Sequence, residues 1–490
     1  NFENEFIEGS IALNNGGAID DFKFKNYNKT LNSEEKIILL SPSNSKNGYL
    51  LNTGWTTNSE VEVPNSNTVW ILESGNKLTP KSPVKIYFEN NAGVRFERTI
   101  TLDEKFFFTI KQKIINNSNK NYKFYPYAFL HRNNVPEDLT DFYILHEGFI
   151  TVGDGELEEV DYDDVEEKKF TREASTGFVS LGDKYWLTSL IPNQGRKFRI
   201  DIDYRQKYRA SFIDLEGFNV DANSSAVHTV KSVIGAKEVK LIDKYAEELN
   251  IKQFDLNISY GIFYWIVRPM HVALNYLYKF SGNYGYAIIL LTILIRIIFF
   301  PLNQYSFKSM SKMKVLAPQL NIIKEKWKED KVQLQKETMK LYKTNGVNPM
   351  SSCFPILLQI PIFFSLYKLL LLDIAMRHAP FIWYWQDLSA KDSGGEWLFS
   401  FLPFNVPSFL EIGLLPVLMG VSMWATQKLN PMPGGNEAAE MQKKIFTWFP
   451  VFIVFILAPF ASGLCLYWCC TNCLQFLQQW YILRKTTVKT

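Results

Sequence analysis

A single arginine interrupts a long apolar run in the second half of the chain. Arg296 lies within Ile293–Phe300, where every other residue is apolar. An arginine in a membrane span costs about 2.5–3.5 kcal/mol, and each neighbouring Ile or Leu returns only about 0.3–0.6 kcal/mol. Such a cation normally faces a partner or a water-filled cavity, although Pro301 is close enough for the side chain to extend to the membrane surface instead. Both arrangements stay open, and the first predicts a cationic wall in a wet groove.

Other polar residues share the apolar runs with Arg296. Thr292 lies one helical turn before it, on the same helical face. The remaining polar interruptions are Gln359 in a second run and Thr471, Asn472 and Gln475 in the last. No acidic residue interrupts these runs, which argues against a structural ion pair and for an anionic or polar ligand. It also argues against a proton-coupled transporter, because such proteins use intramembrane carboxylates or histidines. Lys368, near the end of its run, is expected to extend its ammonium group outward.

Residue spacing supports no other chemistry. The cysteines of Cys469–Cys473 stand in an apolar run without His or acidic neighbours, so we interpret them as packing residues rather than a metal or redox site. Eight carboxylates crowd residues 156–167, but the glycine that a calcium loop requires is absent, so a solvated acidic loop is expected. His131, His146 and His228 have no ligand-type spacing. Since no phosphate-binding loop or nucleophile elbow is present either, the sequence predicts no catalytic site, metal or cofactor.

Charge divides the chain into two unlike halves. The 490 residues include 53 Lys and Arg and 50 Asp and Glu, and the mean hydropathy is −0.10. Residues 1–250 have 38 acidic and 30 basic side chains, a net charge of −8, whereas the remainder has 12 acidic and 23 basic side chains, a net charge of +11. An acidic soluble half is thus joined to an apolar basic half. This asymmetry indicates contact with a membrane or a nucleic acid rather than a single globular enzyme.

The first half has the pattern of β structure. Short alternating apolar runs are separated by Asn, Gly, Asp and Ser clusters, with turn sequences at Asn14–Gly17 and Val152–Gly155. Many short strands with such spacing favour a large antiparallel sandwich. We therefore expect an all-β sandwich domain over residues 1–245.

Five apolar runs of roughly spanning length follow in the second half. They are Tyr284–Pro301, Pro355–Leu372, Ile412–Leu429, Ile445–Ala461 and Gly463–Leu483. Since a span needs about 20 residues, the pattern predicts a polytopic α-helical membrane domain over residues 284–490. Lys and Arg gather after the first, third and fifth runs, which assigns these segments to the cytoplasm and the acidic β domain to the bacterial periplasm. A further span or signal is expected upstream.

Two amphipathic segments flank the first apolar run. Residues 246–283 are expected to form a linker and an interfacial helix that begins near Pro269 and lies along the outer membrane surface. Residues 303–346 have an apolar stripe at intervals of three and four, with one break near Asp330, which predicts a cytoplasmic helical hairpin. Its lysine-rich face is either simply solvated or in contact with RNA or the ribosome.

Several motifs of the second half resemble those of the YidC membrane protein insertases. In matching order they are Arg296 with Phe300-Pro301-Leu302, Lys308-Ser309-Met310 with Lys312-Met313, Leu316-x-Pro318, Asn348-Pro349, Cys353-Phe354-Pro355 with Gln359 and Pro361-Ile362-Phe363, Leu418-Met419-Gly420, and Ser462-Gly463-Leu464 with Leu466-Tyr467. Residues 1–245 are similar, through weaker motifs, to the periplasmic domain of the Gram-negative members.

The resemblance implies a membrane protein insertase and chaperone of the bacterial inner membrane, without enzymatic activity, that acts alone or beside the Sec translocon. A hydrophilic groove, open to the cytoplasm and to lipid, would receive the polar tail of a nascent membrane protein. By similarity, the substrate would contact Thr292, Phe363, Tyr467 and Trp468, where Trp468 replaces an expected Tyr. The implied partners are nascent membrane proteins, the Sec translocon with its accessory subunits, the lipid bilayer, and a ribosome or targeting factor at the cytoplasmic hairpin.

Three alternatives stay open. One is a Sec-associated scaffold or chaperone without autonomous insertion activity. Another is a small-molecule transporter, although such proteins commonly have internal repeats and the sequence shows none. The third, a sugar-binding or enzymatic β domain, rests on fold analogy alone.

Overall fold

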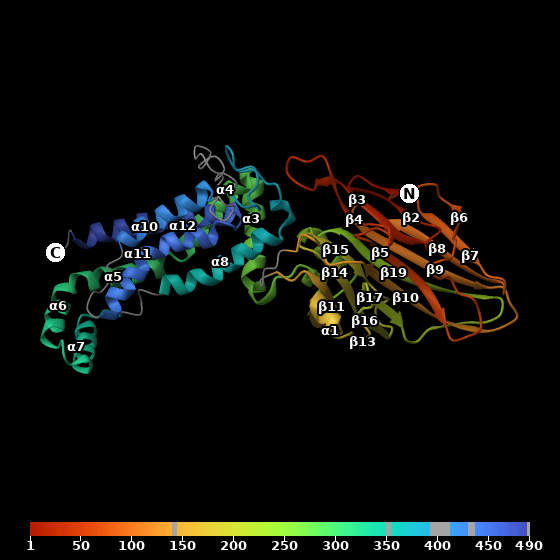
Figure 1. The fold of residues 1–490 in the computed structure, drawn as a ribbon, viewed down its shortest axis with the longest axis horizontal. Coiled ribbons are helices and arrows are strands. Elements are labelled where there is room, and N and C mark those ends of the chain that lie inside the picture. The colour runs from red at the N-terminus through yellow and green to blue at the C-terminus, as the bar shows by residue number, and fades with distance from the viewer. Residues whose placement is uncertain (140–144, 349–353, 393–411, 430–436, 488–490) are drawn as a thin grey trace. The chain divides into compact units, whose positions relative to one another are not determined.

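The computed structural model describes residues 1–139, 145–348, 354–392, 412–429 and 437–487. The chain forms two compact units, residues 1–259 with 372–374, and residues 260–371 with 375–490. Strands dominate the first, called the β unit here, and helices make up the second, the helical unit (Figure 1).

The β unit consists of two antiparallel sheets, which confirms the expected sandwich. The ten-stranded sheet contains β1 (Phe2–Glu3), β2 (Ile7–Ala12), β3 (Ala18–Asn28), β4 (Lys36–Leu40), β5 (Tyr49–Thr57), β10 (Tyr122–Arg132), β13 (Phe170–Ala174), β16 (Phe198–Tyr204), β17 (Tyr208–Asp214) and β18 (Phe218–Val220). The nine-stranded sheet contains β6 (Ile71–Ser74), β7 (Val84–Glu89), β8 (Val94–Leu102), β9 (Phe107–Asn116), β11 (Gly148–Gly153), β12 (Glu156–Val160), β14 (Gly177–Gly182), β15 (Trp186–Leu190) and β19 (Ser224–Ala236).

Alternation along the strands sends one set of side chains into the core. In β10, Phe124 and Leu130 are buried, whereas Tyr127 between them is partly exposed. Aromatic rings from the two sheets meet edge to face, as in Phe2 against Phe108, whose ring centroids are 5.4 Å apart. Each such pair contributes about 0.5–1.5 kcal/mol beyond the area that it buries.

One buried arginine organises the turn at Asn14–Gly17. Arg98 is 3% exposed, and its Nη1 donates to the carbonyl oxygens of Gly16 and Gly17 at 2.8 and 3.1 Å. Both glycines have positive φ angles, and a Cβ on Gly17 would lie 2.7 Å from Nη1. Burial lowers the pKa of Arg98 to about 9. The turn therefore needs glycine twice, for its backbone conformation and for the close approach of the guanidinium group.

The acidic stretch is not the solvated loop that the sequence predicted. It forms β12, which pairs with β11, and a short helix, α1 (Tyr162–Glu167). Val160, Tyr162 and Val165 are buried, so the apolar residues between the carboxylates anchor the segment while the acidic groups point outward.

The helical unit follows a helix of the β unit, α2 (Val239–Glu248). Its helices are α3 (Tyr264–Ser281), α4 (Tyr284–Ile298), α5 (Phe300–Val315), α6 (Ala317–Lys326), α7 (Lys331–Thr344), α8 (Phe354–Leu372), α10 (Leu414–Leu429), α11 (Glu437–Leu457) and α12 (Ser462–Thr487). Among the described residues, no single helix combines the length and apolarity of a candidate membrane span, but α4 and α5 qualify together across a 65° bend. Pro301, without an N–H to donate, lies at this bend.

The interfacial helix begins earlier than predicted. α3 starts at Tyr264 after a short turn of 3-10 helix over Gly261–Phe263, and Pro269 lies inside it. Burial of Val267 and Met270 stabilises the turns on both sides of the proline. Packing therefore outweighs the hydrogen bond that Pro269 cannot donate.

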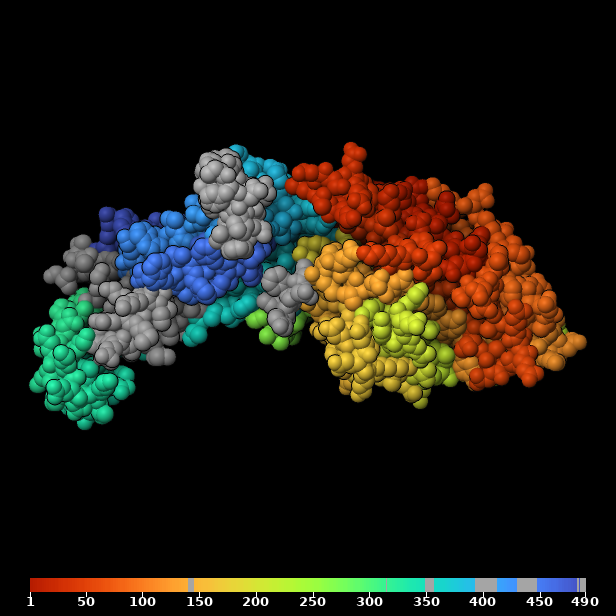
Figure 2. Space-filling view, viewed as in Figure 1, coloured from red at the N-terminus to blue at the C-terminus, as the bar shows by residue number. Residues whose placement is uncertain are grey.

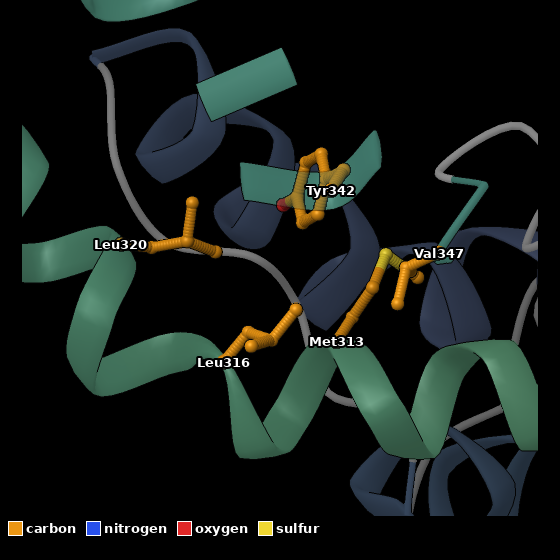
Figure 3. Packing of buried hydrophobic residues seen from close by; sticks show 5 residues of the cluster. All are labelled: Met313, Leu316, Leu320, Tyr342 and Val347. Carbon is orange, nitrogen blue, oxygen red and sulfur yellow. The ribbon is translucent and has the colours of Figure 1, made fainter. Parts of the chain in front are cut away.

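The segment 303–346 contains three helices rather than one hairpin with a single break. The stripe is interrupted a first time at Leu316, ahead of Pro318 at the start of α6, and again at Asp330, whose side chain accepts a hydrogen bond from the N–H of Gln333 and caps α7. α6 and α7 form a small lobe (teal in Figure 2). Its apolar cluster is Met313, Leu316, Leu320, Tyr342 and Val347 (Figure 3).

Replacing His228 with Phe should weaken the pH dependence of β-unit stability. Burial lowers the pKa of His228 to about 4, while Asp214 raises it and Arg196 lowers it. Because the unfolded histidine titrates near 6.5, the unfolded chain binds more protons between these values, and stability present above about pH 6.5 is lost as the pH falls toward about 4. This share amounts to about 3 kcal/mol at most.

Urea unfolding of residues 1–259 between about pH 7 and about pH 4, followed by tryptophan fluorescence, measures this slope. The slope should be smaller in His228→Phe. The part that remains should include His131, whose pKa burial also lowers to about 4. An unchanged slope in His228→Phe contradicts the assignment.

Candidate functional site

The arginine in the first apolar run connects two helices of the helical unit. Nη2 of Arg296, on α4, donates to the backbone oxygen of Thr471 at 3.1 Å and to Oε1 of Gln475 at 3.2 Å, both on α12. Within the described part of the chain, Arg296 makes no ion pair with a carboxylate. Its acceptors are therefore neutral, and its positive charge is solvated but not cancelled.

A second polar contact joins α8 to the same helix. Nε2 of Gln359 donates to the hydroxyl oxygen of Tyr467 at 2.6 Å, and Tyr467 is 1% exposed. One turn further along, Phe363 packs against Trp468 with ring centroids 4.8 Å apart. Tyr467, Thr471 and Gln475 recur every four residues and so share one face of α12. We call Arg296, Gln359, Tyr467, Thr471 and Gln475 the polar cluster.

The neighbouring face of α12 packs against α10 instead. Nδ2 of Asn472 donates to the hydroxyl of Ser422 at 3.1 Å, and the Asn472 backbone oxygen accepts from Thr426 at 3.3 Å. The sequence interpretation missed Ser422 and Thr426, although their polar types and four-residue spacing within an apolar run were a usable signal. Asn472 is buried, so the structure brings it together with α10 rather than with Arg296.

Thr292 is also committed to packing. Its side chain is completely buried, and Oγ1 donates to the backbone oxygen of Ile288 one turn earlier at 2.7 Å. Of the nine expected groove residues, the structure thus brings together Arg296, Gln359, Phe363, Tyr467, Trp468, Thr471 and Gln475, and it places Thr292 and Asn472 in helix contacts. Substrate contact stays a prediction for all nine.

Large apolar side chains are exposed around the polar cluster. The most exposed are Ile297 and Ile298 on α4, Leu357 and Ile360 on α8, Val421 on α10, and Val451 and Phe452 on α11. A contiguous apolar surface of this kind is typical of a membrane or protein contact. The helices themselves pack closely, since a Cβ on Gly420 of α10 would lie 2.4 Å from Cγ2 of Val454 on α11.

Lys368 does not extend outward as expected. The residue is 5% exposed, and its Nζ lies 2.8 Å from the position that a Cβ on Gly261 would occupy. Gly261 therefore leaves room for the ammonium group beneath the start of α3, within the helical unit.

The cysteines of the last helix are all free thiols. Cys465 is buried, and Sγ of Cys469 lies 3.5 Å from the backbone oxygen of Leu415 on α10. Cys353 lies outside the described residues. A search of the described residues finds no group of three His, Cys, Asp or Glu side chains that could hold a metal ion.

Comparison with known proteins gives the same answer for both units. The model of the 60Kd inner membrane protein family matches residues 276–489, and that of the YidC periplasmic domain matches residues 1–273. The membrane protein insertase YidC of Pelagibacter ubique is 50% identical over 100% of this chain and 87% of its own length. That of Brucella melitensis is 39% identical over 99% of this chain and 80% of its own. A crystal structure of an active YidC insertase aligns with 98% of this chain and 91% of its own at 18% identity and a TM-score of 0.40.

Removing the Gln359–Tyr467 hydrogen bond should loosen α8 from α12. In a double-mutant cycle of Gln359→Leu and Tyr467→Phe, we expect a coupling of about 0.6 kcal/mol, the typical value for side-chain hydrogen bonds between membrane helices. Unfolding of the full chain in mixed micelles supplies the free energies. Gln359→Leu combined with Asn472→Leu is the matched control and should be additive, because Asn472 contacts α10. A coupling no larger than in this control pair contradicts the assignment.

Proposed function

The chain belongs to the YidC family of membrane protein insertases, and from that premise we propose that it inserts and folds nascent proteins of the bacterial inner membrane through a hydrophilic groove lined by the polar cluster. The observation that carries this proposal is Arg296, a cation held by two neutral acceptors among apolar helices. A charge in such surroundings normally serves a ligand or an ion pathway.

Arg296 acts on the part of the substrate that the bilayer opposes. The tail that must cross carries polar and acidic groups, and an uncancelled guanidinium attracts them into the groove. Gln359, Gln475 and Tyr467 add neutral donors and acceptors that replace water along the way. The polar cluster thereby lowers the barrier for the tail without binding it permanently.

The hydrophobic segment of the substrate supplies the free energy. Each buried Leu, Ile, Phe or Val in a span contributes about 0.3–0.6 kcal/mol on insertion scales, so a run of such residues favours the bilayer. The exposed apolar side chains of α4, α8 and α11 offer that segment a lateral path into lipid. Insertion on this account needs no nucleotide.

The two units work on opposite sides of the membrane in this proposal. The acidic β unit lies in the periplasm, and the lysine-rich segment α6–α7 lies in the cytoplasm, in keeping with the positive-inside rule. Lys331, Lys336 and Lys340 of α7 are exposed, and the lobe that holds them meets a ribosome or a targeting factor. The chain works alone or beside the Sec translocon.

Replacing Arg296 with Glu should impair insertion of acidic-tailed substrates most. Single-span substrates that differ only in the charge of a short tail are synthesised by ribosomes outside proteoliposomes that contain only this protein, and protease protection of the tail is scored. Reversal of the charge repels a carboxylate that the native residue attracts, so protection of acidic tails should fall about tenfold or more, and that of neutral tails much less.

Two variants control this experiment. Arg296→Lys keeps the charge and should retain most of the acidic-tail insertion, and Lys279→Glu makes the same charge change at an exposed residue of α3 and should have little effect. Equal loss for all tails in Arg296→Glu contradicts its electrostatic role. Failure of the native protein to protect any tail, in the absence of the Sec translocon, favours a chaperone or scaffold over an autonomous insertase.

Reversing three charges on α7 should weaken ribosome binding. The triple variant Lys331→Glu, Lys336→Glu and Lys340→Glu changes only exposed side chains, so the apolar cluster under them stays intact. Lost contacts to phosphates should lower the affinity and flatten its dependence on salt, by about 0.9 logarithmic units per contact. Co-sedimentation with ribosomes at several salt concentrations tests this. Replacement of the same lysines by Arg should preserve binding, and unchanged binding in the Glu variant would exclude α7 as the contact.

A further inference from the structure

A cleft opens on one face of the ten-stranded sheet in the β unit. Its volume of about 920 Å³ falls within the range of roughly 300–1,000 Å³ that is typical of ligand sites. Strands β5, β10, β17 and β16 form the floor, where one row of register partners runs Asn52, Phe129, Ser211 and Asp201. Aromatic, polar and charged side chains therefore meet on one surface, and the insertion mechanism uses none of them.

Two aromatic rings occupy the centre of this floor. The ring centroids of Tyr127 and Phe129 are 6.1 Å apart, and their planes differ by 20°. Tyr127 packs against Gly54, where an added Cβ would lie 2.6 Å from the ring. The guanidinium of Arg209 lies over Phe129, 4.7 Å from the ring centroid. This stacking orients the planar fork of Arg209, which is suited to bidentate binding of a carboxylate.

Cations outnumber carboxylates along the cleft. The cations are Lys169, Arg199, Arg205, Lys207 and Arg209, and the carboxylates are Asp201 and Asp203. The surrounding half of the sequence has a net charge of −8, so the cleft reverses the charge of its own domain. A cleft lined by one sign of charge concentrates ligands of the opposite sign.

Both carboxylates of the cleft already have cationic partners. Asp201 pairs with Lys169 at 2.7 Å and with Arg199 at 3.0 Å, and Asp203 pairs with Arg205 at 3.6 Å. Over the described residues, Lys207 and Arg209 have no such ion pair. The cleft thus presents donors in excess of acceptors, and its ligand must supply negatively charged acceptors.

Recognition in the cleft depends on side chains. β10, β16 and β17 each pair with a strand on both sides, so their backbone groups are not open to addition of a further strand. His131 at one end of the floor stays uncharged at neutral pH, because burial, Lys207 and Arg209 lower its pKa to about 4. The positive charge therefore comes from Lys and Arg and persists across the physiological pH range.

We propose that this cleft binds acidic segments of extended polypeptide, namely the translocated tails of the proteins that the chain inserts. The source of the peptide rests on the proposed function, in which the tail and the β unit occupy the same compartment. An acidic tail matches the charge of the cleft, and its aromatic residues match Tyr127. An acidic saccharide has similar charge, but its hydroxyl groups also need acceptors, and both carboxylates of the cleft are taken up by ion pairs.

Fluorescence anisotropy on the full chain in detergent tests this proposal. The probe is a labelled peptide of alternating Glu, Ser and Tyr, and the comparison peptide has Lys in place of Glu. We expect saturable binding of the Glu peptide alone. The double variant Lys207→Glu with Arg209→Glu should bind it about tenfold or more weakly, in line with the loss of hydrogen bonds to charged groups.

Three controls separate the cleft from other cations. Lys111→Glu makes a similar charge change on exposed β9, outside the cleft, and should leave the affinity unchanged. Arg209→Lys should lose part of the affinity, because it keeps the charge without the planar fork. Arg296→Gln should bind normally, which excludes the polar cluster as the binding site.

Two results would overturn the proposal. One is equal affinity of the double variant and the native chain for the Glu peptide. The other is tighter binding of a labelled oligogalacturonate, an acidic saccharide, than of the Glu peptide. Since this readout does not depend on insertion, a chain that inserts substrates but does not bind the peptide contradicts this inference alone. A chain that binds the peptide but inserts nothing contradicts the proposed function alone.

Discussion

A guanidinium group among apolar helices must be solvated by the protein or by water, and the helical unit is built around that constraint. Arg296 meets it with a backbone oxygen and an amide oxygen of α12. Neutral acceptors solvate the charge without cancelling it, in contrast to a buried ion pair. The same contacts hold α4 against α12, so one residue connects the packing of the unit with an electrostatic field that a substrate can use.

The other helices extend this arrangement. α8 reaches α12 through Gln359 and Phe363, and α10 reaches its neighbouring face through Ser422. Because successive residues on a helix point about 100° apart, α12 offers a polar face to α4 and α8 and a second polar face to α10. A polar surface on one side and apolar side chains on the other suit a protein that handles chains with a polar tail and a greasy span.

Much of the architecture was predictable because local patterns decide it. Alternation and the Asn-Gly turns predicted the antiparallel sandwich, which the fold confirms. Residue spacing correctly grouped Thr471 and Gln475 with Arg296, but it also included Asn472, whose direction depends on the position of α10. The predicted loop over residues 156–167 was wrong because three buried apolar side chains outweigh the acidic composition, and the start of α3 was wrong because packing overrides Pro269. Tertiary contacts of this kind are not encoded in local spacing.

The central claim is that one face of α12 meets the substrate while the adjacent face does not. A photoreactive phenylalanine analogue at Trp468, which packs against Phe363, is compared with the same analogue at Asn472, which packs against α10. Each full chain is illuminated with ribosomes that carry a stalled single-span substrate. The account predicts cross-links to the nascent chain from position 468 and few from position 472. Equal cross-linking from both positions, or stronger cross-linking from 472, would contradict it.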